Sequence, residues 1–164
     1  MTKLQDLDAQ LITKLSNYSP TNKDEMVIAC RDLANQWQSS GRERKAIEWY
    51  EKALSLLDLN VVEDLSTGIP IQRALGSLWI ALGKHRDAVK YFQMVLDGEK
   101  RCHGEQSLEV AGAHYALGSL FKSLVRRKPA EANLTKSLEI LTSLLGQDHP
   151  HAQKVANSLA DIKK

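Results

Sequence analysis

The residue types that could carry chemistry are few and widely spaced in this sequence. His149 directly follows Asp148, but an aspartate before His-Pro at the start of a helix is explained by capping and by the helix dipole. The sequence shows no nucleophile motif, no glycine-rich phosphate loop and no paired-carboxylate pattern. The other histidines share no helical spacing of the kind that zinc requires: His85, His103, His114 and His151. We therefore predict no catalysis, no bound metal and no cofactor.

Cysteine usage and hydropathy favour a cytoplasmic protein. Cys30 and Cys102 each lie within a helical pattern, lack partners at metal-ligand spacing and are expected to be buried thiols, which indicates a reducing compartment. The segment MTKLQDLDAQ contains no uninterrupted apolar region of the signal-peptide type. No run approaches the roughly 18 apolar residues of a membrane span, so we expect no membrane association.

The charge balance does not favour nucleic acid as a partner. The chain carries 22 Lys and Arg residues against 20 Asp and Glu residues, a net charge of +2. One basic run is formed by Arg126, Arg127 and Lys128. It is either a hydrated turn or a contact for phosphate or an acidic partner.

The residues that would position any site recur at a fixed interval. Leu33, Leu75 and Leu117 are separated by 42 residues each time, since 75 − 33 and 117 − 75 both equal 42. Two further sets keep the same interval: Ala46, Ala88 and Ala130, and Trp37, Trp79 and Phe121. A constant period of this size is typical of stacked supersecondary units that complete one another's apolar core.

Periodicity and turn residues divide the chain. We expect an N-terminal packing helix and linker in residues 1–21 and a repeat domain in 22–164. Gly41 and Gly83 are expected to end the first helix of a hairpin, whereas Val125 stands at that place in the third and should give a turn of different shape. Repeats are predicted at about 23–58, 67–99 and 107–144, followed by a capping helix at about 149–163. A linker is expected at 58–67, with Ser66 or Thr67 capping the helix that follows and Pro70 in the first turn of that helix. Pro129 is expected in the first turn of a later helix.

These patterns resemble a known repeat family. Leu-Gly-x-x-Trp/Phe, glycine at the turn and Ala-x-x-x-Tyr/Phe-x-x-x-Leu are similar to the tetratricopeptide repeat (TPR). The interval of 42, with Leu-Gly-Gln-Asp-His-Pro over residues 145–150, resembles the longer repeats of kinesin light chains. The first two repeats lack that element. The resemblance covers residues 23–164 and implies an all-α, right-handed α-solenoid of three TPR-like helical hairpins with an N-terminal helix and a C-terminal capping helix.

The resemblance also implies a function. In this family the first helix of each hairpin lines a concave groove that receives a partner's peptide, so we predict an adaptor or scaffold that binds a protein or peptide partner. An acidic segment is one candidate for that partner's contact. The predicted groove residues are Arg31, Asn35, Gln38, Arg73, Ser77, Ile80, Tyr115, Ser119, Lys122 and Asn157, with Asp161 beside them. The same side chains could instead be ordinary solvated helix faces.

A second interpretation stays open. The chain could be a structural assembly subunit that self-associates, or packs in a larger complex, through its terminal helices or its convex face. The sequence does not decide the oligomeric state.

Overall fold

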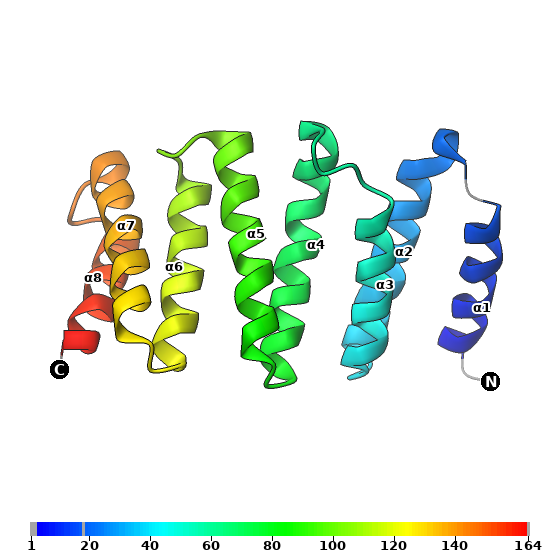
Figure 1. Cartoon of the computed structure of the whole chain (residues 1–164), viewed down its shortest axis with the longest axis horizontal. Helices are drawn as coiled ribbons and strands as arrows, with labels where there is room; N and C mark the ends of the chain where they lie inside the picture. The colour runs from blue at the N-terminus through cyan, green and yellow to red at the C-terminus, as the bar shows by residue number, and fades with distance from the viewer. Residues whose placement is uncertain (1–2, 18, 164) are drawn as a thin grey trace. The chain divides into compact units, whose positions relative to one another are not determined.

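The computed structural model describes residues 3–17 and 19–163, and the regular elements in this part of the chain are all helical (Figure 1). The prediction of an all-α fold is confirmed. In chain order the elements are α1 (Lys3–Ser16), the 3-10 turn η1 (Pro20–Asn22), α2 (Lys23–Ser39), α3 (Glu43–Ser55), α4 (Val62–Ala81), α5 (His85–His103), α6 (Leu108–Ser123), α7 (Arg127–Leu145) and α8 (Pro150–Lys163). No helix of the described residues is long and apolar enough to cross a membrane.

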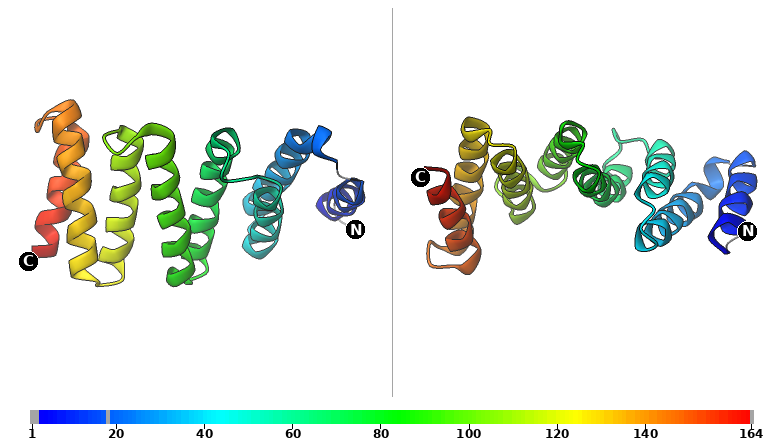
Figure 2. Two further views of the ribbon diagram at one scale, coloured as in Figure 1. Left: turned by 45° about the horizontal axis from the view of Figure 1, so that its top comes forward. Right: turned by 90° about the horizontal axis from the view of Figure 1, so that it is seen from below.

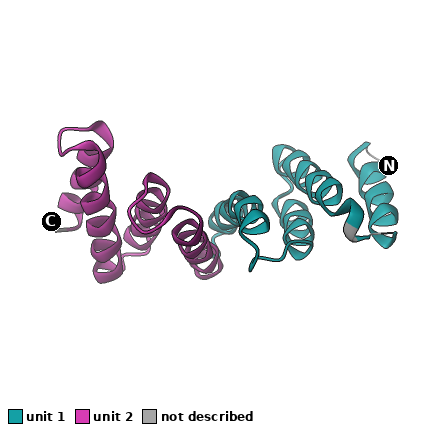
Figure 3. Ribbon diagram, turned by 90° about the horizontal axis from the view of Figure 1, so that it is seen from above, with its two compact units in different colours: residues 1–84 teal, residues 85–164 magenta. Residues whose placement is uncertain are grey.

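The chain divides into two compact units, residues 1–84 and residues 85–164 (Figure 3). The division falls between α4 and α5, within the predicted second repeat. The first unit contains α1 to α4 and the second contains α5 to α8.

In the first unit, α2 and α3 form an antiparallel hairpin (Figure 2). Gly41 ends α2 with φ +71°, in the left-handed region that glycine enters without steric cost. The helices approach closely because Ala34 and Ala46, both fully buried, leave room at the crossing. Trp37 and Trp49 are 2% and 1% exposed and supply the bulk of this core.

The surroundings of each turn recur at the predicted interval. In each turn, the residue after the left-handed position donates its backbone N–H to the carbonyl of an aromatic residue five positions earlier. The pairs are Arg42 to Trp37 at 3.0 Å, Lys84 to Trp79 at 2.8 Å and Arg126 to Phe121 at 2.9 Å. In the same pairs the cation lies 5.7, 5.1 and 5.9 Å from the aromatic ring centroid. Equivalent residues therefore have equivalent surroundings.

The third turn has the shape of the other two, contrary to expectation. Val125 adopts φ +57°, close to the +71° of Gly41 and Gly83. The hydrogen bond from Arg126 to Phe121 closes it in the same way. The packing of α6 against α7 therefore imposes a conformation that a β-branched residue resists. Pro129 lies in the first turn of α7, as predicted.

Helix α4 begins earlier than the sequence indicated. It starts at Val62, so the linker predicted at 58–67 is shorter. Asp64 in its first turn accepts a hydrogen bond from the Asp58 N–H at 2.7 Å and forms an ion pair with Lys23 at 2.6 Å. The first turn of α4 has no side-chain cap, and these contacts stabilise it instead.

The residues expected at the start of α4 lie inside it. Ser66 and Thr67 donate their hydroxyl groups to the Glu63 carbonyl at 2.7 and 3.1 Å and do not cap the helix. Pro70 lies in the helix interior and not in its first turn.

In the second unit, α5 packs on α6, α6 forms a hairpin with α7, and α8 packs on both α7 and α6. Ser137 of α7 donates its buried hydroxyl group to the Ala111 carbonyl of α6 at 2.8 Å. Helix α8 buries Ala152, Val155 and Ile162 and occupies the place of the predicted capping helix.

Candidate functional site

The predicted groove residues on α2 form one polar cluster. Tyr50 of α3, which is 3% exposed, directs its hydroxyl group to Oδ1 of Asn35 and to Oε1 of Gln38, the latter at 3.1 Å. Burial raises the pKa of Tyr50, and the nearby Arg31 charge lowers it by less. Arg31 also forms an ion pair with Asp32 at 3.2 Å. The structure therefore brings Arg31, Asn35 and Gln38 together around the buried Tyr50.

The predicted groove residues on α4 differ in exposure. Arg73 is half-buried, whereas Ser77 and Ile80 are exposed. Ser77 donates its hydroxyl group to the Arg73 carbonyl at 3.1 Å, so this hydroxyl group bonds within its own helix. Ile80 is 37% exposed and leaves an apolar surface beside the polar residues.

On α6, the predicted residues face α8. Lys122 pairs with Asp161 of α8 at 3.1 Å and also donates to the Ser158 carbonyl at 3.5 Å. Ser119 is half-buried beside them, and Asn157 of α8 is exposed. The ammonium group of Lys122 is therefore already engaged within the chain.

Tyr115 is the centre of the α6–α8 contact. Burial acts to raise the pKa of Tyr115, but hydrogen bonds to Ser158 and Ser119 and the charge of Lys154 lower it on balance. The Lys154 ammonium group lies 5.1 Å from the centroid of the tyrosine ring. The aromatic ring thus lies at the contact between α6 and α8.

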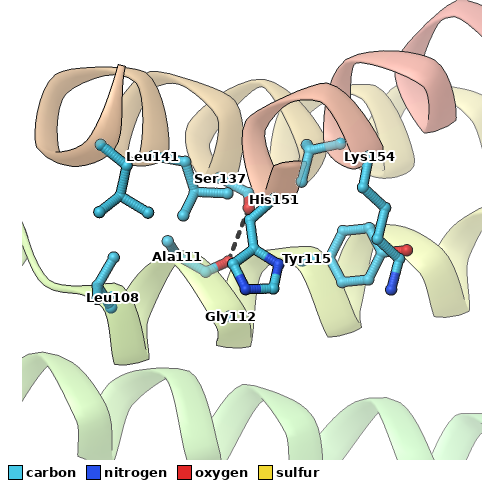
Figure 4. Close-up of a pocket in the computed structure, with 10 residues that line it drawn as sticks. Leu108, Ala111, Gly112, Tyr115, Ser137, Leu141, His151 and Lys154 are labelled. Atoms are coloured by element: carbon cyan, nitrogen blue, oxygen red, sulfur yellow. Dashed lines mark hydrogen bonds between the residues drawn. The ribbon is translucent and has the colours of Figure 1, made fainter. Parts of the chain in front are cut away.

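A pocket of about 270 Å³ opens beside Tyr115, between α6, α7 and α8 (Figure 4). Its wall is mainly apolar, and its polar side chains are Tyr115, Ser137, His151 and Lys154. A Cβ atom at Gly112 would meet nothing within 4 Å, so the absent side chain helps to open the pocket. The remaining lining residues are Leu108, Ala111, Leu141, Leu145 and Val155.

Sequence reasoning found Tyr115 but missed the rest of this pocket. His151 and Lys154 were not among the predicted groove residues, although Asn157 of the same helix was. One signal was present: Gly112 lies in the middle of α6, where glycine costs about 1 kcal/mol relative to alanine. A glycine inside a helix indicates either close packing or open space beside it, and at Gly112 the open space is part of the pocket.

The described residues contain no group of three or more histidine, cysteine or acidic side chains that could hold a metal ion. Of the two cysteines, Cys30 is buried as expected, but Cys102 is only half-buried. Both are free thiols.

Comparison with known proteins gives partial matches in sequence. No family model matches the chain. Nephrocystin-3 of Homo sapiens is 33% identical over 89 residues, which cover 52% of this chain and 7% of that protein. Nephrocystin-3 of Xenopus laevis is 32% identical over the same length and with the same coverage. The chain thus matches only a small part of these relatives.

Comparison with solved structures covers nearly the whole chain. Kinesin light chain TPR-like repeats from Podosopora anserina match 97% of this chain and 75% of their own, with a TM-score of 0.75 and 16% identity. BtubC (BKLC) from P. vanneervenii matches 99% of this chain and 66% of its own, with a TM-score of 0.68 and 24% identity. The chain has a TPR-like repeat fold. The resemblance found in the sequence is therefore confirmed.

A third TPR-like neighbour is the TPR domain of Arabidopsis FLU, with a TM-score of 0.60, 21% identity and coverage of 74% of this chain and 98% of that domain.

Proposed function

We propose that this chain is an adaptor or scaffold that binds a partner's peptide segment along the predicted groove residues, with an apolar side chain of the peptide held in the pocket between α6, α7 and α8. Residues 22–164 would form the TPR-like binding domain, working in the cytoplasm without catalysis. The single observation that carries the proposal is the pocket itself. It is roomy, mainly apolar and open to the surface beside the ring of Tyr115.

The charges around the pocket support a peptide with a carboxylate next to its apolar anchor. His151 and Lys154 are exposed side chains among the lining residues, and no lining residue is acidic. A carboxylate placed near Lys154 would gain a charge-assisted hydrogen bond while the neighbouring side chain displaces water from the apolar wall. This supports the acidic partner segment that the sequence suggested.

Gly112 offers a direct test. Replacing it with leucine should place a side chain in the open space over α6 and fill the pocket, while raising the helix propensity of the position. Glu109→Leu is the matched control, because Glu109 is exposed on the same helix and does not line the pocket.

The experiment selects peptides from a random display library on the wild-type chain and measures their dissociation constants by calorimetry. Gly112→Leu should weaken binding by at least about tenfold, the range expected when an interface anchor is lost, and Glu109→Leu should not. Arg73→Glu reports whether the α4 residues also contact the peptide. Unchanged affinity in Gly112→Leu would show that the pocket is not the site.

A further inference from the structure

Helix α1 is attached to the first hairpin through one carboxylate. Oδ1 of Asp8 accepts a hydrogen bond from Nε1 of Trp37 at 3.2 Å and another from Nε1 of Trp49. Lys45 places its ammonium nitrogen 3.9 Å from Oδ2 of the same residue. One donor comes from α2, and the other donor and the cation come from α3. The two tryptophans are called the indole pair below.

The indole pair donates both of its N–H groups to one carboxylate. An indole N–H can only donate, and with α1 in place both rings are almost fully buried, so each N–H needs an acceptor within the folded chain. Cations reinforce the preference for a negative group: Arg42 lies 5.7 Å from the Trp37 ring centroid, and Lys52 lies 3.9 Å from the Trp49 ring centroid. In this structure the acceptor is Asp8.

The rest of α1 is loosely packed. Leu11 is its only buried residue among those described, and Ile12 is 50% exposed. Hollows of about 160 and 460 Å³ lie along its seam with α2. The first is lined by Leu7 and Leu11, and the second by Leu4. The carboxylate contact therefore adds a specific polar anchor to the burial of Leu11.

We propose that the α2–α3 face with the indole pair is a second interaction surface, distinct from the pocket, and that α1 covers it as an exchangeable occupant. Its partner is an amphipathic helix of a separate protein with one carboxylate beside its apolar stripe, spaced as Leu4, Leu7, Asp8 and Leu11 are in α1. Such a helix fits because it satisfies both indole donors while its leucines cover the seam. Binding requires α1 to leave, so the surface is regulated from within the chain.

The probe that tests this is a fluorescein-labelled peptide of residues 3–17, added to the full chain and followed by anisotropy. Asp8→Ala in the chain removes the internal carboxylate and should let the peptide bind at least about tenfold more tightly than to the wild type, because its internal competitor is weakened. Asp6→Ala is the matched control: Asp6 is an exposed residue of the same helix, so this chain should behave as the wild type. A peptide that itself carries Asp8→Ala should bind the Asp8→Ala chain at least about tenfold more weakly.

Two results would overturn the proposal: equal binding of the peptide to the wild-type and Asp8→Ala chains, or equal binding of the peptides with and without Asp8. A second measurement does not depend on any variant. In the wild-type chain, hydrogen exchange of the α1 amides should be faster than that of α2 and α3, and equal protection would contradict an exchangeable helix. A wild-type chain that sediments as a dimer through α1 would assign the surface to a second copy and not to a separate partner.

Discussion

Lys23 at the start of α2 and Asp64 in the first turn of α4 form an ion pair with 2.6 Å between Nζ and Oδ1. The carboxylate also accepts the Asp58 N–H, so it joins α2, α4 and the linker of the first unit. We expect Asp64→Asn to lower the free energy of unfolding by about 2 kcal/mol, the range for hydrogen bonds to a charged group in a mostly buried position. Urea unfolding measures this. Asp87→Asn, which affects only an exposed ion pair with Lys90, should change stability by less than about 0.5 kcal/mol.

The same carboxylate predicts a pH dependence. The hydrogen bond from Lys23, the Asp58 N–H and the Lys23 charge hold the pKa of Asp64 below its ordinary value of 3.8, and burial opposes them with a smaller effect. Because the folded-state pKa is the lower one, this stabilisation is present above about pH 4 and is lost as the pH falls through the folded-state pKa. Thermal unfolding between pH 2 and pH 6 should show a smaller acid loss in Asp64→Asn than in the wild type. Equal losses would count against this assignment.

We expect the replacement of Val125 by glycine to stabilise the chain. It is 80% exposed and holds φ +57°, a conformation that costs a β-branched residue about 1–2 kcal/mol. Val125→Gly should raise the free energy of unfolding by about 1 kcal/mol after the added freedom of the unfolded chain is counted. The mirror substitution, Gly83→Val, should lower it, although a Cβ at Gly83 would meet nothing within 4 Å. Thermal unfolding of the two variants checks both signs, and stabilisation by Gly83→Val would refute the conformational explanation.

Two glycines of α6 should respond oppositely to alanine. A Cβ at Gly118 would lie 2.7 Å from Cγ and 3.1 Å from the backbone nitrogen of Leu134, so Gly118→Ala should destabilise the chain by about 1–3 kcal/mol. A Cβ at Gly112 would meet nothing within 4 Å, so Gly112→Ala should stabilise it by about 0.5–1 kcal/mol through helix propensity. Chemical denaturation of both variants gives the comparison. Similar effects at the two positions would mean that the α6–α7 packing described above is wrong.

The two thiols should differ in reactivity. Burial raises the pKa of Cys30 to about 11, with a smaller opposing effect from Lys52. At pH 8 it is therefore a protonated, buried thiol, whereas Cys102 is half-buried and accessible. Ellman's reagent should titrate one thiol promptly and the second only after unfolding in guanidinium. Cys102→Ser should remove the prompt phase, and its persistence in that variant would reverse the assignment.

The repeat architecture could be predicted from the sequence because its signal is local and periodic. Trp37, Trp79 and Phe121 stand at one interval, and each accepts the same turn hydrogen bond in the structure. The shape of the third turn could not be predicted, because the packing of α6 on α7 overrides the preference of Val125 for negative φ.

Contacts between residues distant in sequence account for the other differences. The start of α4 depends on Asp64 meeting Lys23, 41 residues away, so the local pattern alone placed that start too late. Similarly, Lys122 was predicted as a groove cation, but the structure pairs it with Asp161, 39 residues away. The pocket needs side chains from three helices, and only Gly112 hinted at it.

The measurement that tests the proposed function most directly is amide chemical-shift mapping of the labelled chain during titration with a selected peptide. The proposal predicts that the largest shifts fall on residues lining the pocket, with Gly112, Tyr115 and Lys154 among them. If α6 and α8 show no shifts while the peptide saturates the chain, then the pocket between α6, α7 and α8 is not the binding site.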